Sequence, residues 1–242
     1  MSVIVVIPTY NERENLSNLA RAVLGLGSSY QLLIVDDNSP DRTGEIADDL
    51  AIEFPGRFDV LHRDAKAGLG RAYVAGLSHA LGLGGTLVAQ MDADHSHRPE
   101  DLARLVAELE GDPGAGLALG SRYVAGGETE GWPWHRKAIS RAGGIYAGLI
   151  LGVPIRDLTG GFKVWRRDAL EAIELSSVHS DGYSFQIETT YRALANGIRV
   201  LQVPITFNDR VAGKSKLSQS VVIEAAIMPW RLRLRKLTRR PW

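Results

Sequence analysis

The residues Asp92-Ala93-Asp94 place two carboxylates two positions apart, directly after the mostly apolar segment 86–91. At the end of a strand, chain curvature can bring both carboxylates, or one directly and one through a water, to a single cation. Oxygen ligands of this kind suit Mg²⁺ or Mn²⁺, which keep some of their waters and complete their coordination with phosphate oxygens. Such a metal offsets the charge that develops as a diphosphate leaves. The pair therefore predicts a metal site that faces a nucleotide-sugar diphosphate.

Taken alone, this pair also has a second interpretation. Asp92 could simply end a strand, and Asp94 could cap the helix region that Pro99 opens. His95 and His97 follow in the same loop. Imidazole binds transition metals, but an i,i+2 spacing in a loop is unspecific. We expect both histidines to lie at the surface or to support the metal ligands, and neither to bind metal.

Two further motifs follow other apolar segments. Asp36-Asp37 stands where an acid can accept hydrogen bonds from a ribose hydroxyl or a base edge, and equally where a carboxylate can open a turn. Gly68-Leu69-Gly70 lacks the third glycine of a dinucleotide-binding loop and the lysine of a P-loop. It predicts a tight packing turn.

Cations and a flexible glycine occur together near the end of the chain, at Arg210, Gly213, Lys214 and Lys216. A loop of this composition can close over phosphates, with arginine making bidentate contacts and lysine acting as a point charge. The same composition fits a solvated charged loop. Without other observations the two interpretations have equal weight.

The elements that must hold these residues alternate between strand and helix. Apolar runs predict strands at 3–7, 31–35, 59–61 and 86–91, and helical spacing of apolar residues predicts helices at 16–24, 46–54, 72–81 and from Pro99 onward. This order predicts a Rossmann-like α/β fold, with a mostly parallel sheet covered by helices on both faces. Ligands of such sheets bind beyond the carboxyl ends of the strands, and three polar clusters fall there: Thr9-Tyr10-Asn11-Glu12, Asp36-Asp37 and Asp92-Ala93-Asp94.

The second half of the chain has a looser pattern. After the apolar run 115–120, the segment 126–134 is rich in glycine and aromatic residues, and we expect it to form a loop over the site. Helices are predicted at 136–151 and 185–196, with a turn at 157–162 and a strand at 200–207. We expect one domain over residues 1–217, followed by a C-terminal amphipathic helix and basic tail over residues 218–242.

Composition limits the class of protein. A chain of 242 residues that is 45% apolar can bury a core in one domain. No cysteine occurs, so any metal must be held by oxygen or imidazole ligands. The N-terminus has no signal-peptide pattern, and the longest weakly polar stretch, 142–153, is shorter than the roughly 20 residues that span a bilayer. We expect a cytoplasmic location.

Four motifs occur in order along the chain: Pro8-Thr9-Tyr10-Asn11-Glu12, Val35-Asp36-Asp37-Asn38-Ser39-Pro40-Asp41, Met91-Asp92-Ala93-Asp94-His95-Ser96-His97 and Gly120-Ser121-Arg122-Tyr123. As an ordered set they resemble the inverting glycosyltransferases of family 2, and within that family the polyprenol- or dolichol-phosphate mannose synthases. The resemblance extends from Val3 to about Leu217. It implies a GT-A fold that uses GDP-mannose, a divalent metal (Mg²⁺ or Mn²⁺) and a membrane-borne polyprenyl phosphate.

The resemblance also implies roles for the matching positions. The nucleoside positions are Pro8, Tyr10, Glu12, Val35 and Asp37. The metal and diphosphate positions are Asp92 and Asp94, with Ala93 beside the donor and Ser96 as a further metal position. Catalytic contacts to the phosphates match Arg122, Arg210 and Lys216, and contacts to the acceptor phosphate match Arg136 and Ser140.

Three positions depart from the family pattern. Arg42 stands where the family commonly has glycine, His95 where it often has leucine, and Gly160 where serine is usual. None of these changes removes a charged ligand, although Gly160 lacks a hydroxyl that could touch the acceptor. Many relatives also carry transmembrane helices that this sequence lacks, which leaves room for a separate membrane-anchoring protein as a partner.

Charge is distributed unevenly along the chain. The whole chain has 28 basic and 28 acidic residues, but the tail 231–242 holds six bases and no acid, so the rest carries 22 bases against 28 acids. The segment 225–237 mixes apolar residues with arginines, and on an anionic membrane each basic residue contributes about 1 kcal/mol. A solvated helix and a nucleic-acid contact are the alternatives. Because the motifs imply a lipid substrate, we expect peripheral contact with a membrane surface and no nucleic acid.

A phosphate acceptor also simplifies the expected chemistry. A phosphate monoester is already anionic near neutral pH, so transfer to it needs no general base. We expect metal, arginine and lysine to stabilise the departing GDP, and neither Asp157 nor Glu188 to act as a base. Two alternatives stay open: a glycosyltransferase of the same fold that uses UDP-glucose, and a non-catalytic sensor of nucleotide sugars with a membrane-binding tail.

Overall fold

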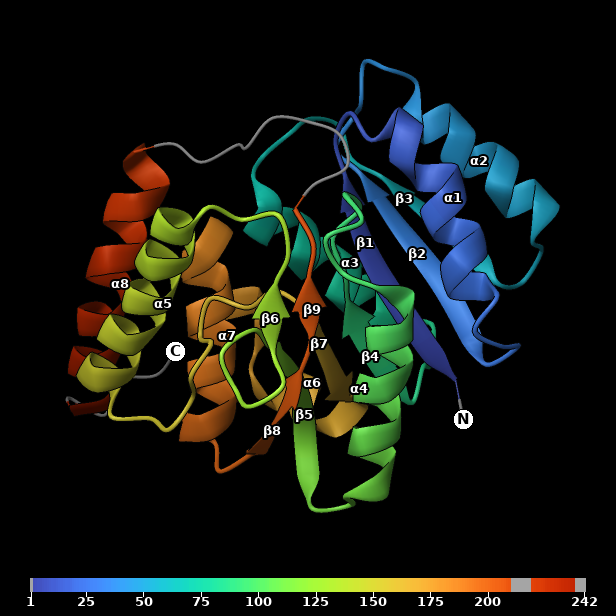
Figure 1. Ribbon diagram of the computed structural model, residues 1–242. Coiled ribbons are helices and arrows are strands. Elements are labelled where there is room, and N and C mark those ends of the chain that lie inside the picture. The colour runs from blue at the N-terminus through green and yellow to red at the C-terminus, as the bar shows by residue number, and fades with distance from the viewer. Residues whose placement is uncertain (1, 210–218, 238–242) are drawn as a thin grey trace.

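A seven-stranded mixed sheet forms the centre of the molecule (Figure 1), with the strand order β3-β2-β1-β4-β7-β5-β8. The computed structural model describes residues 2–209 and 219–237. The strands are β1 (Val3–Thr9), β2 (Tyr30–Asp36), β3 (Phe58–His62), β4 (Leu87–Gln90), β5 (Ala115–Ser121), β7 (Lys163–Arg166) and β8 (Arg199–Pro204). Neighbouring strands pair in parallel except where β7 pairs antiparallel with β4 and β5.

Successive residues of β1 serve two hydrophobic cores, because alternate side chains of a strand point to opposite faces. Val5 packs in the core under α1 (Arg13–Leu24), α2 (Thr43–Glu53) and α4 (Pro99–Gly111), whereas Val6 packs in the core under α3 (Leu69–Gly82), α6 (Arg167–Ala172) and α7 (Gly182–Ala195). The predicted Rossmann-like sheet, covered on both faces, is therefore confirmed.

Two long helices lie side by side beyond the end of the sheet that carries β8 (Figure 1). They are α5 (Trp134–Leu151) and α8 (Gln219–Leu237), and both pack with α7 in a third apolar cluster that contains Leu151, Tyr191 and Leu232. No helix in the described ranges is both long and apolar enough to cross a membrane.

The sequence missed β7 and α6, which occupy residues 163–172. Two of the four residues of β7 are cationic, so the segment lacks the apolar run that predicts an interior strand. Lys163 is nevertheless fully buried, because its Nζ donates to the Gln186 carbonyl (3.0 Å) and to the Thr189 hydroxyl (2.8 Å). Hydrogen bonds to α7 therefore allow Lys163 to lie in an interior strand, although the local sequence lacks an apolar run.

The predicted strand at 200–207 is divided in two. β8 ends at Pro204, and β9 (Thr206–Phe207) instead pairs with β6 (Glu128–Thr129). This short second sheet ties the glycine- and aromatic-rich segment 126–134 to the end of β8, so the segment is held close to the carboxyl ends of the central strands.

Candidate active site

A cleft of about 340 Å³ opens at the carboxyl ends of β1, β2, β4 and β5. Most of the residues expected to bind the donor or acceptor line this cleft: Pro8, Tyr10, Glu12, Asp37, Asp92, Ala93, Asp94, Arg122 and Arg136. The cleft lies where ligands bind in open α/β sheets, because every parallel strand ends there. Segments from both halves of the chain thus meet around one cavity.

In the Asp92-Ala93-Asp94 motif, Oδ1 of each carboxylate accepts hydrogen bonds from the protein. Asp92 Oδ1 accepts a hydrogen bond from the Tyr73 hydroxyl at 2.9 Å. Asp94 Oδ1 accepts from the backbone N–H (3.1 Å) and the hydroxyl (2.6 Å) of Ser96. The interpretation of Asp94 as a helix cap is wrong, because the N-cap residue of α4 is Arg98 and makes no side-chain cap hydrogen bond.

His97 supports the loop that carries these carboxylates. Its ring is buried, stacks on Phe162 at 4.4 Å between centroids and meets the edge of Phe207 at 5.4 Å. Burial lowers the pKa of His97, so the imidazole stays neutral and its Nδ1 can accept from the Asp92 N–H at 3.1 Å. His95 adopts a φ of 60° and shapes the same turn.

The two adjacent acids at the end of β2 have different surroundings. Asp36 is buried and accepts from the Thr9 hydroxyl (3.0 Å) and from the backbone N–H (3.0 Å) and hydroxyl (2.6 Å) of Ser39, so it organises a turn. Asp37 lines the cleft and pairs with Arg63. Burial raises the pKa of Asp37, and the neighbouring Arg63 opposes that rise. The turn interpretation of this motif therefore holds for Asp36, whereas nucleoside binding by Asp37 stays a prediction.

Arg122 is a buried cation in the wall of the cleft. Its guanidinium donates to both oxygens of Asp157, at 2.8 Å from Nε and 2.6 Å from Nη2. Burial alone lowers the pKa of Arg122, but the charge and hydrogen bonds of Asp157 outweigh burial and raise that pKa above its ordinary value. Arg122 therefore stays cationic at any pH at which the protein is folded.

Neither carboxylate considered as a base lies along the cleft. Asp157 is fully buried in its pair with Arg122. Glu188 accepts from Arg192 at 2.5 Å and from the Ser180 hydroxyl at 2.5 Å. Both acids are thus held in ion pairs away from the lining of the cleft, and the absence of a general base stays a prediction.

The segment 126–134 contributes an aromatic wall to the cleft. Trp132 is 8% exposed and lines the cavity. The Arg136 guanidinium lies 4.0 Å from the centroid of the Trp132 ring, and its Nη1 donates to Asp209 at 2.9 Å. Stacking on an aromatic face and an ion pair hold Arg136 at the mouth of the cleft.

Some expected positions lie away from the cavity or beyond the described residues. Val35 is buried in the core beneath α3, and Ser96 is fully buried behind Asp94, to which its hydroxyl donates. Ser140 lies one helical turn after Arg136 on α5 and does not line the cleft. Arg210 and Lys216 fall outside the described residues. A role for each of these positions stays a prediction.

Several residues of the cleft were not found from the sequence. Lys66 extends over the Tyr10 ring at 4.1 Å, and the start of α7 contributes Asp181, Tyr183 and Gln186. The only sequence signal for this segment is the residue type of Asp181, an aspartate at the N-cap of α7, which accepts from the Gly182 N–H at 2.8 Å.

The predicted packing turn at Gly68-Leu69-Gly70 is confirmed. A Cβ on Gly70 would lie 2.3 Å from the Ser180 carbonyl oxygen, and the Gly70 N–H donates to Asp181. Gly68 has a φ of +105°, which favours glycine. These glycines therefore let α3 and α7 begin against each other at the edge of the cleft.

The donor set suits a divalent cation that is only partly ligated by protein. Within residues 2–209 and 219–237, no group of three or more histidine, cysteine or acidic side chains is arranged to hold a metal. Asp92 and Asp94 offer carboxylate oxygens at the cleft. Mg²⁺ fits such a site, because it usually binds one or two carboxylates and completes its shell with water and substrate phosphates.

Comparison of the sequence with known proteins gives consistent relatives. The pattern that defines Glycosyl transferase family 2 matches residues 4–174. The polyprenol monophosphomannose synthase of Mycolicibacterium smegmatis is 48% identical over 95% of this chain and 87% of its own length. The undecaprenyl-phosphate mannosyltransferase of Micrococcus luteus is 44% identical over 94% and 92% of the two chains. The dolichol-phosphate mannosyltransferase of Pyrococcus furiosus is 38% identical, and this chain covers 61% of it.

Comparison of the structures supports the fold alone. Glucosyl-3-phosphoglycerate synthase from Mycobacterium tuberculosis, in complex with Mn²⁺, UDP-glucose and phosphoglyceric acid, matches with a TM-score of 0.69 at 19% identity over 96% of this chain and 79% of that chain. The same synthase in complex with Mg²⁺ and UDP matches with a TM-score of 0.65 at 20% identity over 99% and 79% of the two chains.

Proposed function

Because this chain belongs to glycosyl transferase family 2, we propose that it transfers mannose, with inversion, from GDP-mannose to a polyprenyl monophosphate. The chain is a GT-A glycosyltransferase. Its relatives at 38–48% identity are named for mannose transfer and for a polyprenol, undecaprenyl-phosphate or dolichol-phosphate. The three alignments each cover at least 93% of this chain, which supports the same acceptor class here.

The observation that carries the proposal is the distribution of charge across one cleft. The carboxylates Asp92 and Asp94 and the cations Arg122 and Arg136 line the same cleft. Carboxylates attract a metal, and the metal with the cations attracts phosphates on both substrates. A cleft with this pattern suits a reaction in which a sugar passes between two phosphate groups.

A bound Mg²⁺ or Mn²⁺ would neutralise the diphosphate of the donor, with Asp92 and Asp94 holding it. Arg122, fixed by Asp157, keeps a permanent positive charge at the cleft wall. Arg136, stacked on Trp132, offers a guanidinium to the acceptor phosphate. Because the acceptor is already anionic, the chain has only to align the two substrates and stabilise departing GDP.

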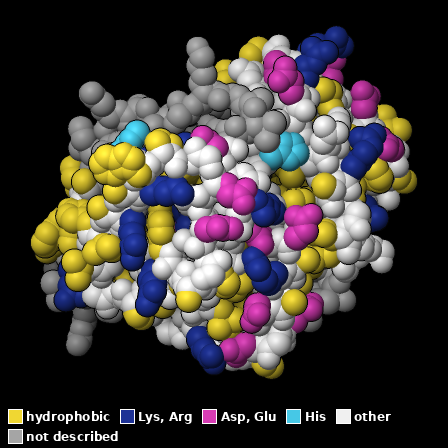
Figure 2. Space-filling view, viewed as in Figure 1, with side chains coloured by type: hydrophobic (Ala, Val, Ile, Leu, Met, Phe, Trp, Pro, Cys, Tyr) yellow, Lys and Arg dark blue, Asp and Glu magenta, His cyan; other side chains and the backbone are white. Residues whose placement is uncertain are grey.

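The surface of α5 and α8 supports contact with a membrane. Figure 2 shows apolar side chains gathered over these two helices, with Lys and Arg side chains among them. On α5, Trp134 is 81%, Ile139 72% and Leu149 78% exposed, and on α8, Trp230 is 54% and Leu234 59% exposed. Arg136 lies on the same α5 that carries this apolar face. Docking by this face would therefore bring the mouth of the cleft to a lipid-borne phosphate.

A transfer assay tests the proposal. The chain is incubated with Mg²⁺ or Mn²⁺, a short polyprenyl phosphate, and either GDP-mannose or UDP-glucose, with the Asp92→Asn/Asp94→Asn double variant as an inactive control. We expect mannosyl lipid from GDP-mannose in the wild type alone. Transfer only from UDP-glucose would overturn the assignment of GDP-mannose as the donor. No transfer from any donor would favour the alternative that the protein is a non-catalytic sensor of nucleotide sugars.

A further inference from the structure

The hydrogen bond between Tyr73 and Asp92 joins α3 to the metal-binding loop. We propose that Tyr73 is a positioning residue, whose hydroxyl holds one oxygen of Asp92 so that the other oxygen is presented to the divalent cation. The inference rests on the proposed metal-dependent transfer, and it assigns to Tyr73 a task that its sequence surroundings do not suggest.

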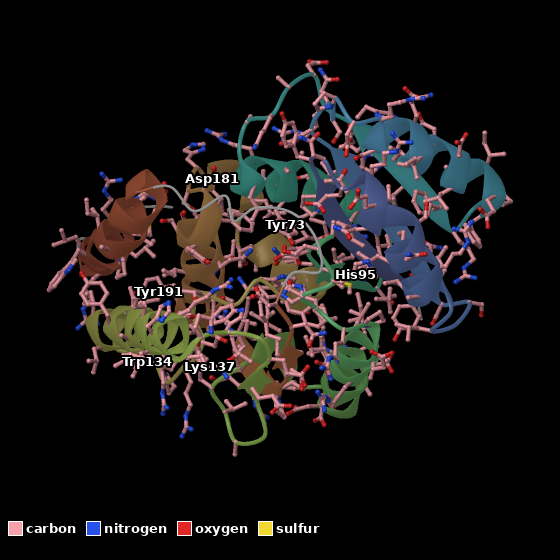
Figure 3. The ribbon with its side chains drawn as sticks, turned by 45° about the horizontal axis from the view of Figure 1, so that its top comes forward. Tyr73, His95, Trp134, Lys137, Asp181 and Tyr191 are labelled. Atoms are coloured by element: carbon pink, nitrogen blue, oxygen red, sulfur yellow. The ribbon has the colours of Figure 1, made fainter. Side chains whose placement is uncertain are left out.

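The geometry separates the two oxygens of the Asp92 carboxylate. Oδ1 accepts from the Tyr73 hydroxyl at 2.9 Å, whereas in the described part of the chain no hydrogen bond reaches Oδ2. Asp92 lines the cleft, and Tyr73 is fully buried beneath it. Figure 3 places Tyr73 in the middle of the molecule, near the loop that carries His95. One oxygen is thus fixed from inside the protein, and the other remains for a ligand in the cleft.

The ring of Tyr73 has a fixed orientation. It stacks on Phe185 of α7, with 5.7 Å between ring centroids and 4° between the ring planes. Both rings are fully buried in the core that α3 and α7 share with the sheet. The phenol cannot swing away from Asp92 without disturbing this packing, so the hydroxyl is a rigid donor.

The position of α3 also sets the height of this hydroxyl above the sheet. Gly76, one turn after Tyr73, lies against β1 and β2, where a Cβ would come within 2.5 Å of Val6 Cγ1 and 2.6 Å of Val35 Cγ2. The glycine therefore lets α3 lie close to the sheet, which brings Tyr73 within reach of the residues that follow β4.

Holding Asp92 in one orientation has a direct consequence for metal affinity. An unrestrained carboxylate must lose rotational freedom when it binds a cation, whereas one already held by a hydrogen bond loses less. Partners of this kind behind metal ligands typically change metal affinity 10- to 100-fold when they are removed. The backbone of Asp92 is held as well, by His97, so Tyr73 adds the restraint on the side chain.

The substitution Tyr73→Phe tests this role, because it removes the hydroxyl and keeps the ring. Mn²⁺ binding to the full chain is measured by electron paramagnetic resonance, with GDP and with UDP. We expect Tyr73→Phe to bind Mn²⁺ about tenfold more weakly. In the transfer assay, the Mn²⁺ concentration for half-maximal rate should rise by a similar factor, while the rate at saturating Mn²⁺ approaches that of the wild type.

The matched control is Tyr191→Phe. Tyr191 is a fully buried tyrosine of α7 in the cluster with α5 and α8, and it does not line the cleft; Figure 3 labels it beside α5, apart from Tyr73. It should leave Mn²⁺ affinity unchanged. Unchanged Mn²⁺ affinity in Tyr73→Phe would overturn the inference, and so would a rate loss that excess Mn²⁺ does not restore.

The outcomes also separate this inference from the proposed function. Weaker Mn²⁺ binding in Tyr73→Phe would support the role of Tyr73 even if the wild type transferred nothing from GDP-mannose. The second result would overturn only the assignment of GDP-mannose as the donor. If the wild type bound no Mn²⁺ with GDP and none with UDP, the proposed metal site and the role of Tyr73 would both be overturned.

Discussion

Arg122 and Asp157, 35 positions apart, form a buried ion pair in which Arg122 donates three hydrogen bonds to Asp157, from its backbone N–H (3.0 Å), Nε (2.8 Å) and Nη2 (2.6 Å). The pair joins the end of β5 to the turn that precedes β7. It fixes a cation in the wall of the cleft at the point where two segments from different parts of the chain meet.

Replacing Asp157 with asparagine should destabilise the protein strongly. The change keeps the shape of the side chain but leaves the buried Arg122 without a counter-charge, which typically lowers the free energy of unfolding by about 3–5 kcal/mol. Urea denaturation measures the effect. The control is Asp112→Asn, which breaks an exposed pair with Arg199 and should change stability by less than about 1 kcal/mol. Equal losses in the two variants would contradict this account of the pair.

Replacing Asp94 with asparagine should weaken metal binding and abolish most transfer. A neutral amide is a poorer ligand for a hard cation than a carboxylate is. Chelation by EDTA should stop the wild-type reaction, and added Mg²⁺ or Mn²⁺ should restore it. Asp59→Asn, a half-exposed acid that pairs with His79, is the control and should behave as wild type. Full activity of the wild type in EDTA would rule out the metal.

Replacing Arg136 with alanine should raise the KM for polyprenyl phosphate by about tenfold, since a charge-assisted hydrogen bond contributes about 1.5–3 kcal/mol. The KM for GDP-mannose should change little, because we assign Arg136 to the acceptor. Steady-state kinetics with each substrate varied in turn distinguish the two. Arg167→Ala, which breaks an exposed pair with Glu171 on α6, serves as the control. A selective rise in the donor KM would reverse the assignment.

Replacing Ile139 and Leu149 with glutamate should weaken binding to anionic vesicles by at least about tenfold, because each exposed apolar side chain that enters a membrane contributes about 1.5–3 kcal/mol. Vesicle sedimentation measures this change. Ile52→Glu alters an equally exposed residue of α2, at 81%, and should bind as wild type. Truncation after Pro229 is a poorer test because it also removes the buried Leu232. Unchanged binding of the double variant would reject this face as the docking surface.

The buried Lys163 should make stability rise with pH. Burial lowers its pKa well below the ordinary value of 10.5, against a smaller opposing effect of Asp157. Between that lowered pKa and 10.5, the unfolded chain binds a proton that the folded chain does not, so the free energy of unfolding increases with pH by up to about 1.4 kcal/mol per unit. Urea denaturation of wild type and Lys163→Met from pH 7 to pH 10 tests this. The wild type should gain stability relative to the variant, and parallel curves would contradict the shift.

The sequence by itself determined the alternation of strands and helices, because burial on both faces of a parallel sheet leaves apolar runs and helical spacing that can be read locally. It also placed the Asp92-Ala93-Asp94 motif in the cleft, since residues after parallel strands meet at one edge. The residue pattern did not decide between Asp36 and Asp37, and only the family resemblance implied Asp37. Neighbouring residues of an extended chain point in opposite directions, and the structure shows that Asp37 is the one that lines the cleft.

The tertiary structure alone decided which partners hold the reactive groups. Tyr73 reaches Asp92 across 19 positions, Arg122 reaches Asp157 across 35, and the Gly70 N–H reaches Asp181 across 111. The insertion of β7 between β4 and β5 is likewise a long-range pairing. Local periodicity records whether a residue is buried, but not what it is buried against. These contacts follow from how α3, α7 and the loop after β5 pack on the sheet, and no local pattern encodes that packing.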